Sequence, residues 1–136
     1  MKAIHFALIG AVLSLSACVD ANAPPPKTSG AEDFAAYCSA CHGAGGKGDG
    51  ELAAEFAKKP ADLTHLSKRN KGAFPTTKVM AQIWGYAGKK GQGVMPDFGP
   101  LLEGDTVPYD GGDGIDTPTP IRLVEMAEYL KSIQAK

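Results

Sequence analysis

The sequence shows no excess of charge of one sign, no internal repeat and no hydrophobic run long enough to cross a membrane. It has 14 Lys and Arg against 15 Asp and Glu, a formal net charge of -1 at pH 7. No stretch interleaves basic and aromatic residues, which argues against nucleic-acid binding. At 136 residues the chain has room for about one domain, which excludes a second catalytic domain. Its 17 Gly and 10 Pro predict short helices separated by loops, and nothing indicates a mostly β architecture.

The charges are unevenly distributed along the chain. Residues 47–90 hold nine Lys and Arg against four acids, whereas residues 97–116 hold six acids and no base. This pattern predicts a basic side and an acidic side. A solvated surface and a docking role explain it equally well, because charge asymmetry steers partners without identifying them.

The first residues have the pattern of an export signal. Lys2 provides a positive start, and the apolar stretch from Ile4 to Leu15 is too short for a stable membrane anchor. Leu15-Ser16-Ala17-Cys18 resembles the lipobox of bacterial lipoproteins, which predicts a signal peptide over residues 1–17 and a diacylated Cys18 at the mature N-terminus. The alternative is an ordinary signal peptide cut after Ala23, although Pro24 would then follow the cut and fits poorly.

Residues 18–29 are predicted to form a tether between this lipid anchor and the folded domain. Pro24, Pro25 and Pro26 favour an extended, semi-rigid chain that buries no core. The expected location is the periplasmic side of a bacterial cell envelope, with the protein attached to a membrane through the lipid on Cys18. A lipid there would also account for the cysteine that has no partner.

Cys38-Ser39-Ala40-Cys41-His42 is the motif with the clearest chemistry. Its spacing is that of c-type haem attachment, in which two thiols bond to the porphyrin and the adjacent imidazole binds the iron. A thioredoxin-like pair, half of a zinc site and a plain disulfide are the alternatives. The first lacks a βαβ setting, and the second lacks another CxxC or paired histidines. The motif therefore predicts one covalent haem c on Cys38, Cys41 and His42.

With this motif near its start, a Met-Pro pair late in the chain and helices at both ends, the stretch from about Gly30 to Ile133 resembles a class I c-type cytochrome. The resemblance implies an all-α fold of short helices and loops around one haem, over residues 30–136. It also implies Met95, in Gly93-Val94-Met95-Pro96, as the sixth iron ligand opposite His42.

The residues around Met95 give this assignment separate support. Met95 lies among glycines and a proline, outside any helical stripe, so a loop can present its thioether. Met80 and Met126 instead fall in register with apolar helical neighbours and are expected to fill the core. His65 is the main rival as a ligand, although a surface position explains it more simply.

Local patterns predict four helices. The capping box formed by Ser29 and Glu32 starts a helix over residues 30–41, and a short helix follows over residues 51–58. Thr76 or Thr77 caps a third helix through Ala87. The last helix is expected to have Thr119 at its cap and Pro120 as its first residue.

Several other residues take roles that only the resemblance implies. Gly30 and Phe34 correspond to positions where the first helix crosses the last, opposite Tyr129 or Leu130. Pro60 and Leu63 resemble a segment along the haem edge, and Trp84 resembles an aromatic near a propionate. The acidic loop 103–116 departs from compact family members. Its aspartates either bind calcium or form a solvated loop, and the incomplete EF-hand spacing favours the loop.

An iron held by His42 and Met95 has no open coordination position, which favours outer-sphere electron transfer over oxygen or peroxide chemistry. The expected function is therefore a membrane-tethered one-electron carrier, not an enzyme. It would serve redox partner proteins in a respiratory or photosynthetic chain. The alternatives are a haem subunit of a larger oxidoreductase and a haem enzyme or gas sensor with an open iron site.

Overall fold

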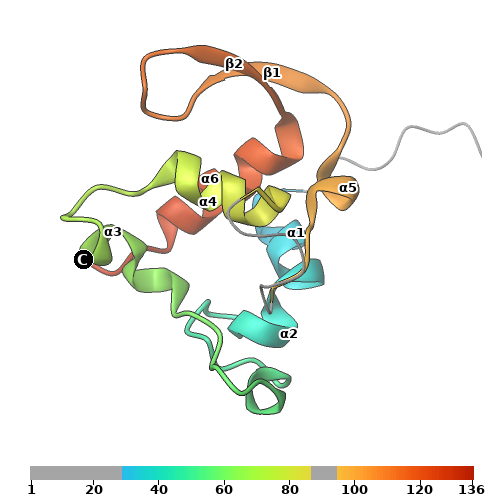
Figure 1. The fold of residues 1–136 in the computed structure, drawn as a ribbon, viewed down its shortest axis with the longest axis vertical. Helices are drawn as coiled ribbons and strands as arrows, with labels where there is room; N and C mark the ends of the chain where they lie inside the picture. The colour runs from blue at the N-terminus through green and yellow to red at the C-terminus, as the bar shows by residue number, and fades with distance from the viewer. Residues whose placement is uncertain (1–28, 87–94) are drawn as a thin grey trace, which may run out of the picture.

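The protein is described by a computed structural model, which covers residues 29–86 and 95–136. Six α-helices, two 3-10 turns and one β-hairpin make up these ranges (Figure 1). Along the chain they are α1 (Gly30–Tyr37), α2 (Ser39–His42), η1 (Ala53–Glu55), η2 (Leu63–His65), α3 (Leu66–Arg69), α4 (Thr76–Trp84), α5 (Gly99–Leu102), β1 (Thr106–Asp110), β2 (Asp116–Pro120) and α6 (Ile121–Ser132).

The first and last helices cross and pack on each other, as predicted. The Ser29 hydroxyl accepts from the Glu32 backbone N–H at 3.3 Å, and the Glu32 carboxylate accepts from the Ser29 N–H at 2.7 Å, so the predicted capping box is present. A Cβ on Gly30 would collide with the Glu125 carbonyl oxygen of α6, so only glycine permits this close approach. One turn later, the Phe34 and Tyr129 rings lie 5.2 Å apart between centroids.

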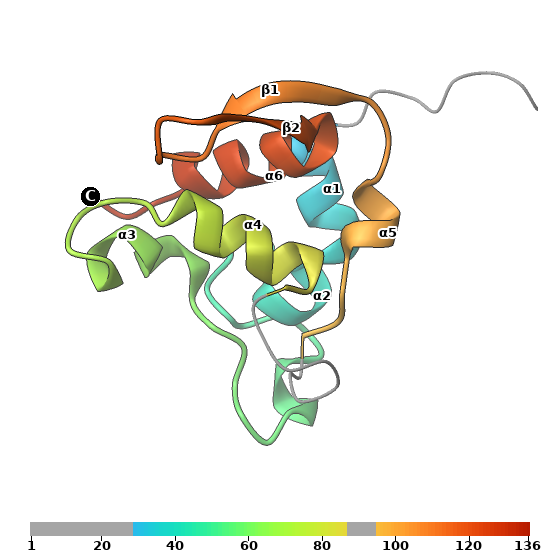
Figure 2. The same cartoon turned by 45° about the horizontal axis from the view of Figure 1, so that its top comes forward.

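The hydrophobic core lies where α1, α4 and α6 meet, with α5 against one side (Figure 2). Met80 and Met126 both belong to it, as their helical register predicts. Its buried side chains are Phe34, Val79, Met80, Ile83, Leu102, Leu123, Met126, Ala127 and Leu130.

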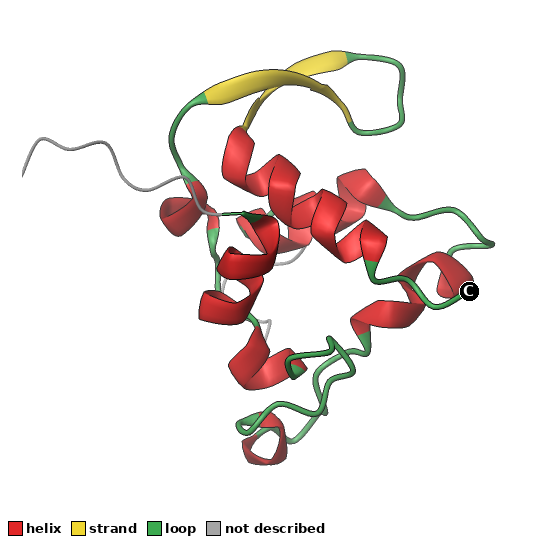
Figure 3. Cartoon of the chain, turned by 180° about the vertical axis from the view of Figure 1, so that it is seen from behind, coloured by secondary structure: helices red, strands yellow, loops and turns green. Residues whose placement is uncertain are grey.

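The prediction of an all-α fold is wrong, because an antiparallel hairpin lies over α6 (Figure 3). β1 lies within the segment 103–116 predicted to be a loop, and β2 begins at the last residue of that segment and extends to Pro120. β-branched residues in both strands and Tyr109 in β1, joined by an Asp/Gly-rich turn, favour a hairpin. The prolines argued against strands in this segment. Pro108 and Pro118 lie opposite each other in one cross-strand pair. Because every second pair in an antiparallel ladder exchanges no hydrogen bond, two prolines without N–H groups fit at such a pair.

The remaining helix boundaries differ from prediction by a few residues. The predicted helix 30–41 is divided at Cys38, and the predicted helix 51–58 is reduced to the short turn η1. Helix α4 has Pro75 at its N-cap and no side-chain cap, so neither threonine caps it. Thr119 belongs to β2 and Pro120 is the N-cap of α6, because the strand runs directly into the helix.

The C-terminal residues fasten η2 and α3 to the end of α6. The Gln134 amide donates to the Leu63 carbonyl at 2.8 Å and accepts from the Ser67 N–H at 2.9 Å. The Ala135 N–H donates to the Thr64 carbonyl at 2.8 Å. The chain that follows α2 is thereby connected back to the helical core. Within residues 29–86 and 95–136, no helix is long and apolar enough to span a bilayer.

Candidate functional site

The Cys38–His42 motif lies at the junction of α1 and α2. Cys38 caps the end of α1, and Cys41 and His42 lie in the single turn of α2. Both cysteines are free thiols that are partly exposed, so no disulfide links them in this structure. The His42 N–H donates to the Cys38 carbonyl at 2.9 Å, which keeps the imidazole and both thiols on one short, rigid turn.

The His42 ring is oriented by a backbone carbonyl. Its Nδ1 lies 2.9 Å from the carbonyl oxygen of Ala61, which can only accept a hydrogen bond. Nδ1 is therefore the protonated nitrogen, and Nε2 carries the lone pair. An N–H donated to a carbonyl in this way fixes the tautomer and orientation of a metal-binding histidine. Sequence reasoning missed this partner, because a backbone carbonyl has no residue signature.

The glycine-rich loop after His42 folds back along α2. The Gly48 N–H donates to the His42 carbonyl at 2.8 Å, and the Gly50 N–H donates to the Cys41 carbonyl at 3.2 Å. Gly48 has a φ of +74°, and a Cβ there would collide with the Pro60 carbonyl oxygen. This approach brings the Pro60–Ala61 segment beside α2, where Ala61 meets His42.

The thiol of Cys38 differs from that of a redox-active cysteine. Burial, with smaller contributions from the nearby charges of Asp33 and Cys41, raises the pKa of Cys38 to about 11. Thioredoxin-like pairs instead need a lowered pKa, since the thiolate is the nucleophile. The environment of Cys38 thus argues against the thioredoxin-like alternative.

Met95 lies at the start of the second described range and is half-buried against the hydrophobic core. The Gln82 side-chain amide of α4 lies 3.8 Å from the Met95 sulfur, within reach of a weak hydrogen bond. Two residues beyond Pro96, the Phe98 N–H donates to the Ile83 carbonyl at 2.9 Å. The end of α4 therefore contacts both the Met95 side chain and the backbone that follows it.

His65, the rival ligand, contacts side chains that are close to it in the sequence. Its Nδ1 lies 3.0 Å from the Asp62 carboxylate and 3.0 Å from the Thr64 hydroxyl. The hydrogen bonds from Thr64, followed by those of His65, lower the pKa of Asp62. These contacts make His65 part of the cap of η2.

A buried ion pair that sequence reasoning missed connects three helices near the motif. Asp33 of α1 is 1% exposed, and Arg122 of α6 donates to both of its carboxylate oxygens, one at 2.9 Å. The same guanidinium donates to the Leu101 carbonyl of α5 and lies 5.8 Å from the Tyr37 ring centroid. The Asp33 hydrogen bonds raise the pKa of Arg122. No spacing rule connects residues so distant in sequence.

The remaining residues predicted from the sequence to have a functional role lie away from α2 or outside the described residues. Trp84 packs on Gly99 and faces the hairpin. In the segment 103–116, the Asp110 carboxylate accepts three backbone N–H groups of the hairpin turn. No group of three or more potential metal-binding side chains occurs among the residues that the structure describes. Cys18, with the signal peptide and the rest of the tether up to residue 28, lies outside the described ranges.

The features of α2 fit a covalently attached haem. The thiols of Cys38 and Cys41 are three residues apart, neither is consumed by a disulfide, and His42 presents an unprotonated Nε2. The family model described as cytochrome c oxidase, cbb3-type, subunit III matches residues 25–107, more than half of the chain. No curated protein and no solved structure matches. The chain therefore belongs to the cbb3-type cytochrome c oxidase subunit III family, as a class I c-type cytochrome that binds c-type haem covalently.

Proposed function

We propose that this cytochrome is a one-electron carrier whose haem iron is held by His42 and Met95, and that lipid on Cys18 tethers it to a membrane on the periplasmic side. Membership of a cytochrome c family already indicates haem-based electron transfer. When bound, the haem supplies one-electron exchange between Fe(II) and Fe(III). The chain's own residues attach, orient and enclose it.

The observation that carries the proposal is the hydrogen bond between His42 Nδ1 and the Ala61 carbonyl at 2.9 Å. It makes Nε2 the available donor atom and raises its basicity, since a partner on the far nitrogen strengthens an imidazole ligand. The adjacent thiols of Cys38 and Cys41 are placed to form the two covalent links.

Met95 is proposed as the second axial ligand. Its thioether is half-buried beside the core, and Gln82 and Ile83 of α4 hold the surrounding segment. A thioether ligand favours Fe(II) and raises the potential, and a second ligand leaves no site for oxygen. Both effects suit a carrier better than a haem enzyme.

The absorption spectrum tests this ligation. The oxidised protein is expected to show the weak charge-transfer band of methionine sulfur bound to Fe(III), and Met95→Ala is expected to abolish it. His65→Ala is the matched control and should retain the band. Rapid carbon monoxide binding by the unmutated reduced protein would contradict the closed iron site.

The tether is tested by Cys18→Ser. The variant is expected to leave the membrane fraction while keeping its haem. The matched control is Cys18→Ser combined with a transmembrane helix fused in place of the leader, which should restore attachment. If Cys18→Ser alone stays in the membrane fraction, lipidation at Cys18 is wrong.

A haem subunit of a larger oxidoreductase is the second candidate. It is favoured by the matched family, whose description names subunit III of an oxidase. Native-size chromatography of a mild detergent extract separates the two candidates. A carrier elutes alone, whereas a subunit co-elutes with its complex.

A further inference from the structure

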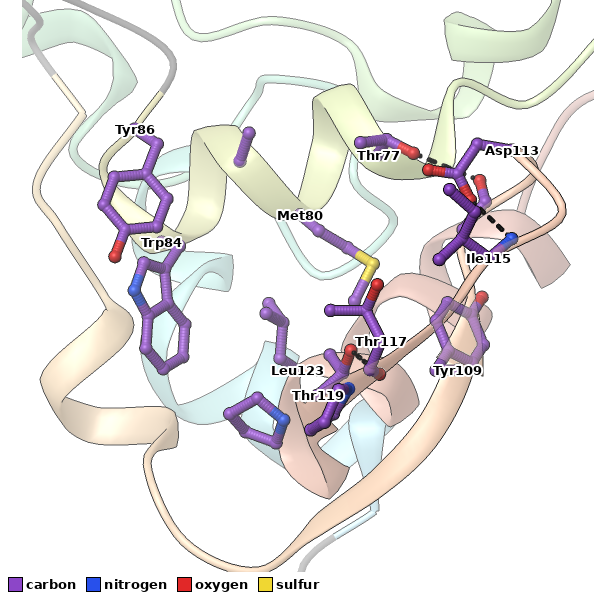
Figure 4. A pocket seen from close by; sticks show the side chains of 14 residues that line it. Thr77, Met80, Trp84, Tyr86, Tyr109, Asp113, Ile115, Thr117, Thr119 and Leu123 are labelled. Carbon is purple, nitrogen blue, oxygen red and sulfur yellow. Dashed lines mark hydrogen bonds between the residues drawn. The ribbon is translucent and has the colours of Figure 1, made fainter.

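A groove lies between the hairpin and α4 (Figure 4). It has a volume of about 380 Å³, within the range of ligand and peptide sites. Met80, Trp84 and Leu123 form its apolar floor, and Tyr109 and Ile115 of the hairpin face them. The Thr77 hydroxyl, which donates to the Gly111 carbonyl at 3.2 Å, joins α4 to the hairpin turn at one end.

Exposed apolar side chains gather at this groove. Among the described residues, four large hydrophobic side chains are exposed, and the two most exposed are Tyr86 at 77% and Ile115 at 62%. Both line the groove. Large apolar groups left in water beside a concave aromatic surface are typical of an interaction site.

The hairpin also places negative charge at one end of the groove. Asp110 and Asp116 are directly opposite each other in the strand pair, and Asp113 in the turn lines the groove. Like charges directly opposite across strands destabilise a hairpin. The backbone N–H groups of Gly112 and Gly114 lower the pKa of Asp110, so this carboxylate stays ionised. A cation brought to the groove would relieve this repulsion.

Most of the hairpin lies outside the residues that the family model matches. The family match ends at residue 107, just after β1 begins. At its base the hairpin is closed where the Ile121 N–H donates to the Asp105 carbonyl at 2.9 Å, which brings the two ends of the hairpin together.

We propose that this groove is a docking site for a segment of a partner protein that carries apolar side chains flanked by lysine or arginine. Its apolar side chains would lie on Trp84 and Ile115, and its basic groups would meet Asp113 and Asp116. The complementary charge selects this occupant over an anionic membrane surface, which the same carboxylates repel. The proposal does not depend on which residue is the sixth iron ligand.

The test uses nuclear magnetic resonance of the reduced, isotope-labelled holoprotein. The probe is a short synthetic peptide in which lysine alternates with leucine and phenylalanine. Trp84 is the only tryptophan of the chain, so its indole N–H gives a single signal from inside the groove. The lysine peptide is expected to shift this signal and those of Tyr109 and Ile115 in a saturable manner.

Two control peptides separate the contributions to binding. Replacing lysine by glutamate should abolish the shifts, and replacing leucine and phenylalanine by serine should also abolish them. If the glutamate peptide binds as well as the lysine peptide, charge complementarity is wrong. If the serine peptide binds as well, the apolar floor plays no part.

Variants of the protein locate the site. Ile115→Ser is expected to lower the affinity for the lysine peptide by about tenfold. Asp116→Asn is expected to lower this affinity by about threefold at low salt. Leu101→Ser is the matched apolar control, because Leu101 is 47% exposed and lies outside the groove. Glu51→Gln, at an exposed position before η1, is the charge control. Both controls should bind normally.

Three results would overturn the proposal. The first is that the peptide shifts map only to residues outside the groove. The second is that the control variants weaken binding as much as the groove variants do. The third is that the same signals shift with protein concentration in the absence of peptide. The last result would make a second copy of this chain, through its own basic segment, the occupant of the groove.

Discussion

The segment around α2 and the hairpin differ in what holds them in shape. Backbone contacts from distant parts of the chain fix the α2 segment: the glycine loop folds back on it, and Ala61 binds His42. The hairpin depends mainly on its own ladder, with side-chain links through Thr77 and Tyr109 to the helices. The first segment is thus held in shape by backbone hydrogen bonds, whereas the hairpin is held by its own ladder and by side chains that reach the helices.

The two regions also differ in charge and in position. The segment from the loop after α2 to the end of α3, residues 43–69, holds five Lys and Arg against four acids, whereas the hairpin, residues 106–120, holds three acids and no base. The hairpin lies over α6, at the other end of the molecule from α2 (Figure 1). A partner at the hairpin therefore meets a negative field, whereas a partner at the α2 end meets nearly balanced charge. Substitutions in one region should therefore leave the function of the other unchanged.

The largest effect is expected where the core meets the α2 segment, at the Asp33–Arg122 pair. Arg122→Met leaves the carboxylate of Asp33 buried without a partner, and we expect a loss of about 3–5 kcal/mol in the free energy of unfolding. Urea denaturation of the holoprotein measures it. Lys131→Ala is the control, because the Lys131–Glu128 pair is half exposed and should contribute under about 1 kcal/mol.

A double variant distinguishes the lost pair from lost packing. Asp33→Leu combined with Arg122→Met replaces both charges by apolar groups and should recover most of the stability. If the double variant is as unstable as Arg122→Met, the packing of the arginine stem on Tyr37 is the larger contribution.

Excision of the hairpin should lower the free energy of unfolding less than Arg122→Met does. It also tests whether the α2 segment can hold its haem without the hairpin. The Ile121 N–H donates to the Asp105 carbonyl at 2.9 Å, so a two-residue Asn-Gly turn can replace residues 106–120. We expect the haem spectrum to be unchanged and the unfolding free energy to fall by roughly 2 kcal/mol, since half-buried Tyr109 and buried Thr119 are lost. Loss of covalent haem from this variant would show that the hairpin is part of the haem site.

Local signals in the sequence predicted the positions of α1, α4 and α6 better than they predicted the hairpin. The capping box of Ser29 and the apolar register of α4 and α6 were sufficient to place the helices, because both depend on residues within a few positions of one another. The family membership and the covalent haem also followed from the Cys38–His42 motif. The strands were missed because their prolines and acids resemble those of a solvated loop.

The contacts that orient the site could not be predicted from the sequence. Ala61 acts through its carbonyl, which every residue possesses, and Arg122 is paired with a residue in a different helix. Gln82 lies near Met95 only because the chain after Pro96 returns to Ile83. Each of these contacts depends on the tertiary fold, and no local pattern encodes it.

The next prediction concerns the pH dependence of the hairpin. Burial, followed by the hydrogen bond to Glu128, raises the pKa of Tyr109 to about 12. The unfolded chain loses this proton near pH 10 and the folded chain retains it, so stability falls as pH rises from about 10 to 12. Unfolding midpoints of the protein and of Tyr109→Phe should therefore converge over this range. A constant difference would mean that the Tyr109 pKa is unchanged by folding.

The smallest effect is expected at Gln82 of α4, beside the proposed iron ligand Met95. If Met95 binds the iron, the Gln82 amide withdraws electron density from the sulfur and favours Fe(II). Gln82→Leu should lower the midpoint potential by about 30 mV, less than the ~59 mV of a tenfold change in a one-electron equilibrium. Gln82→Glu should lower it further, because it adds a negative charge in place of a donor. The methionine charge-transfer band is expected to persist in both variants, which shows that the potential changes without loss of the methionine ligand. Equal midpoint potentials in the unmutated protein, Gln82→Leu and Gln82→Glu would exclude a role for Gln82.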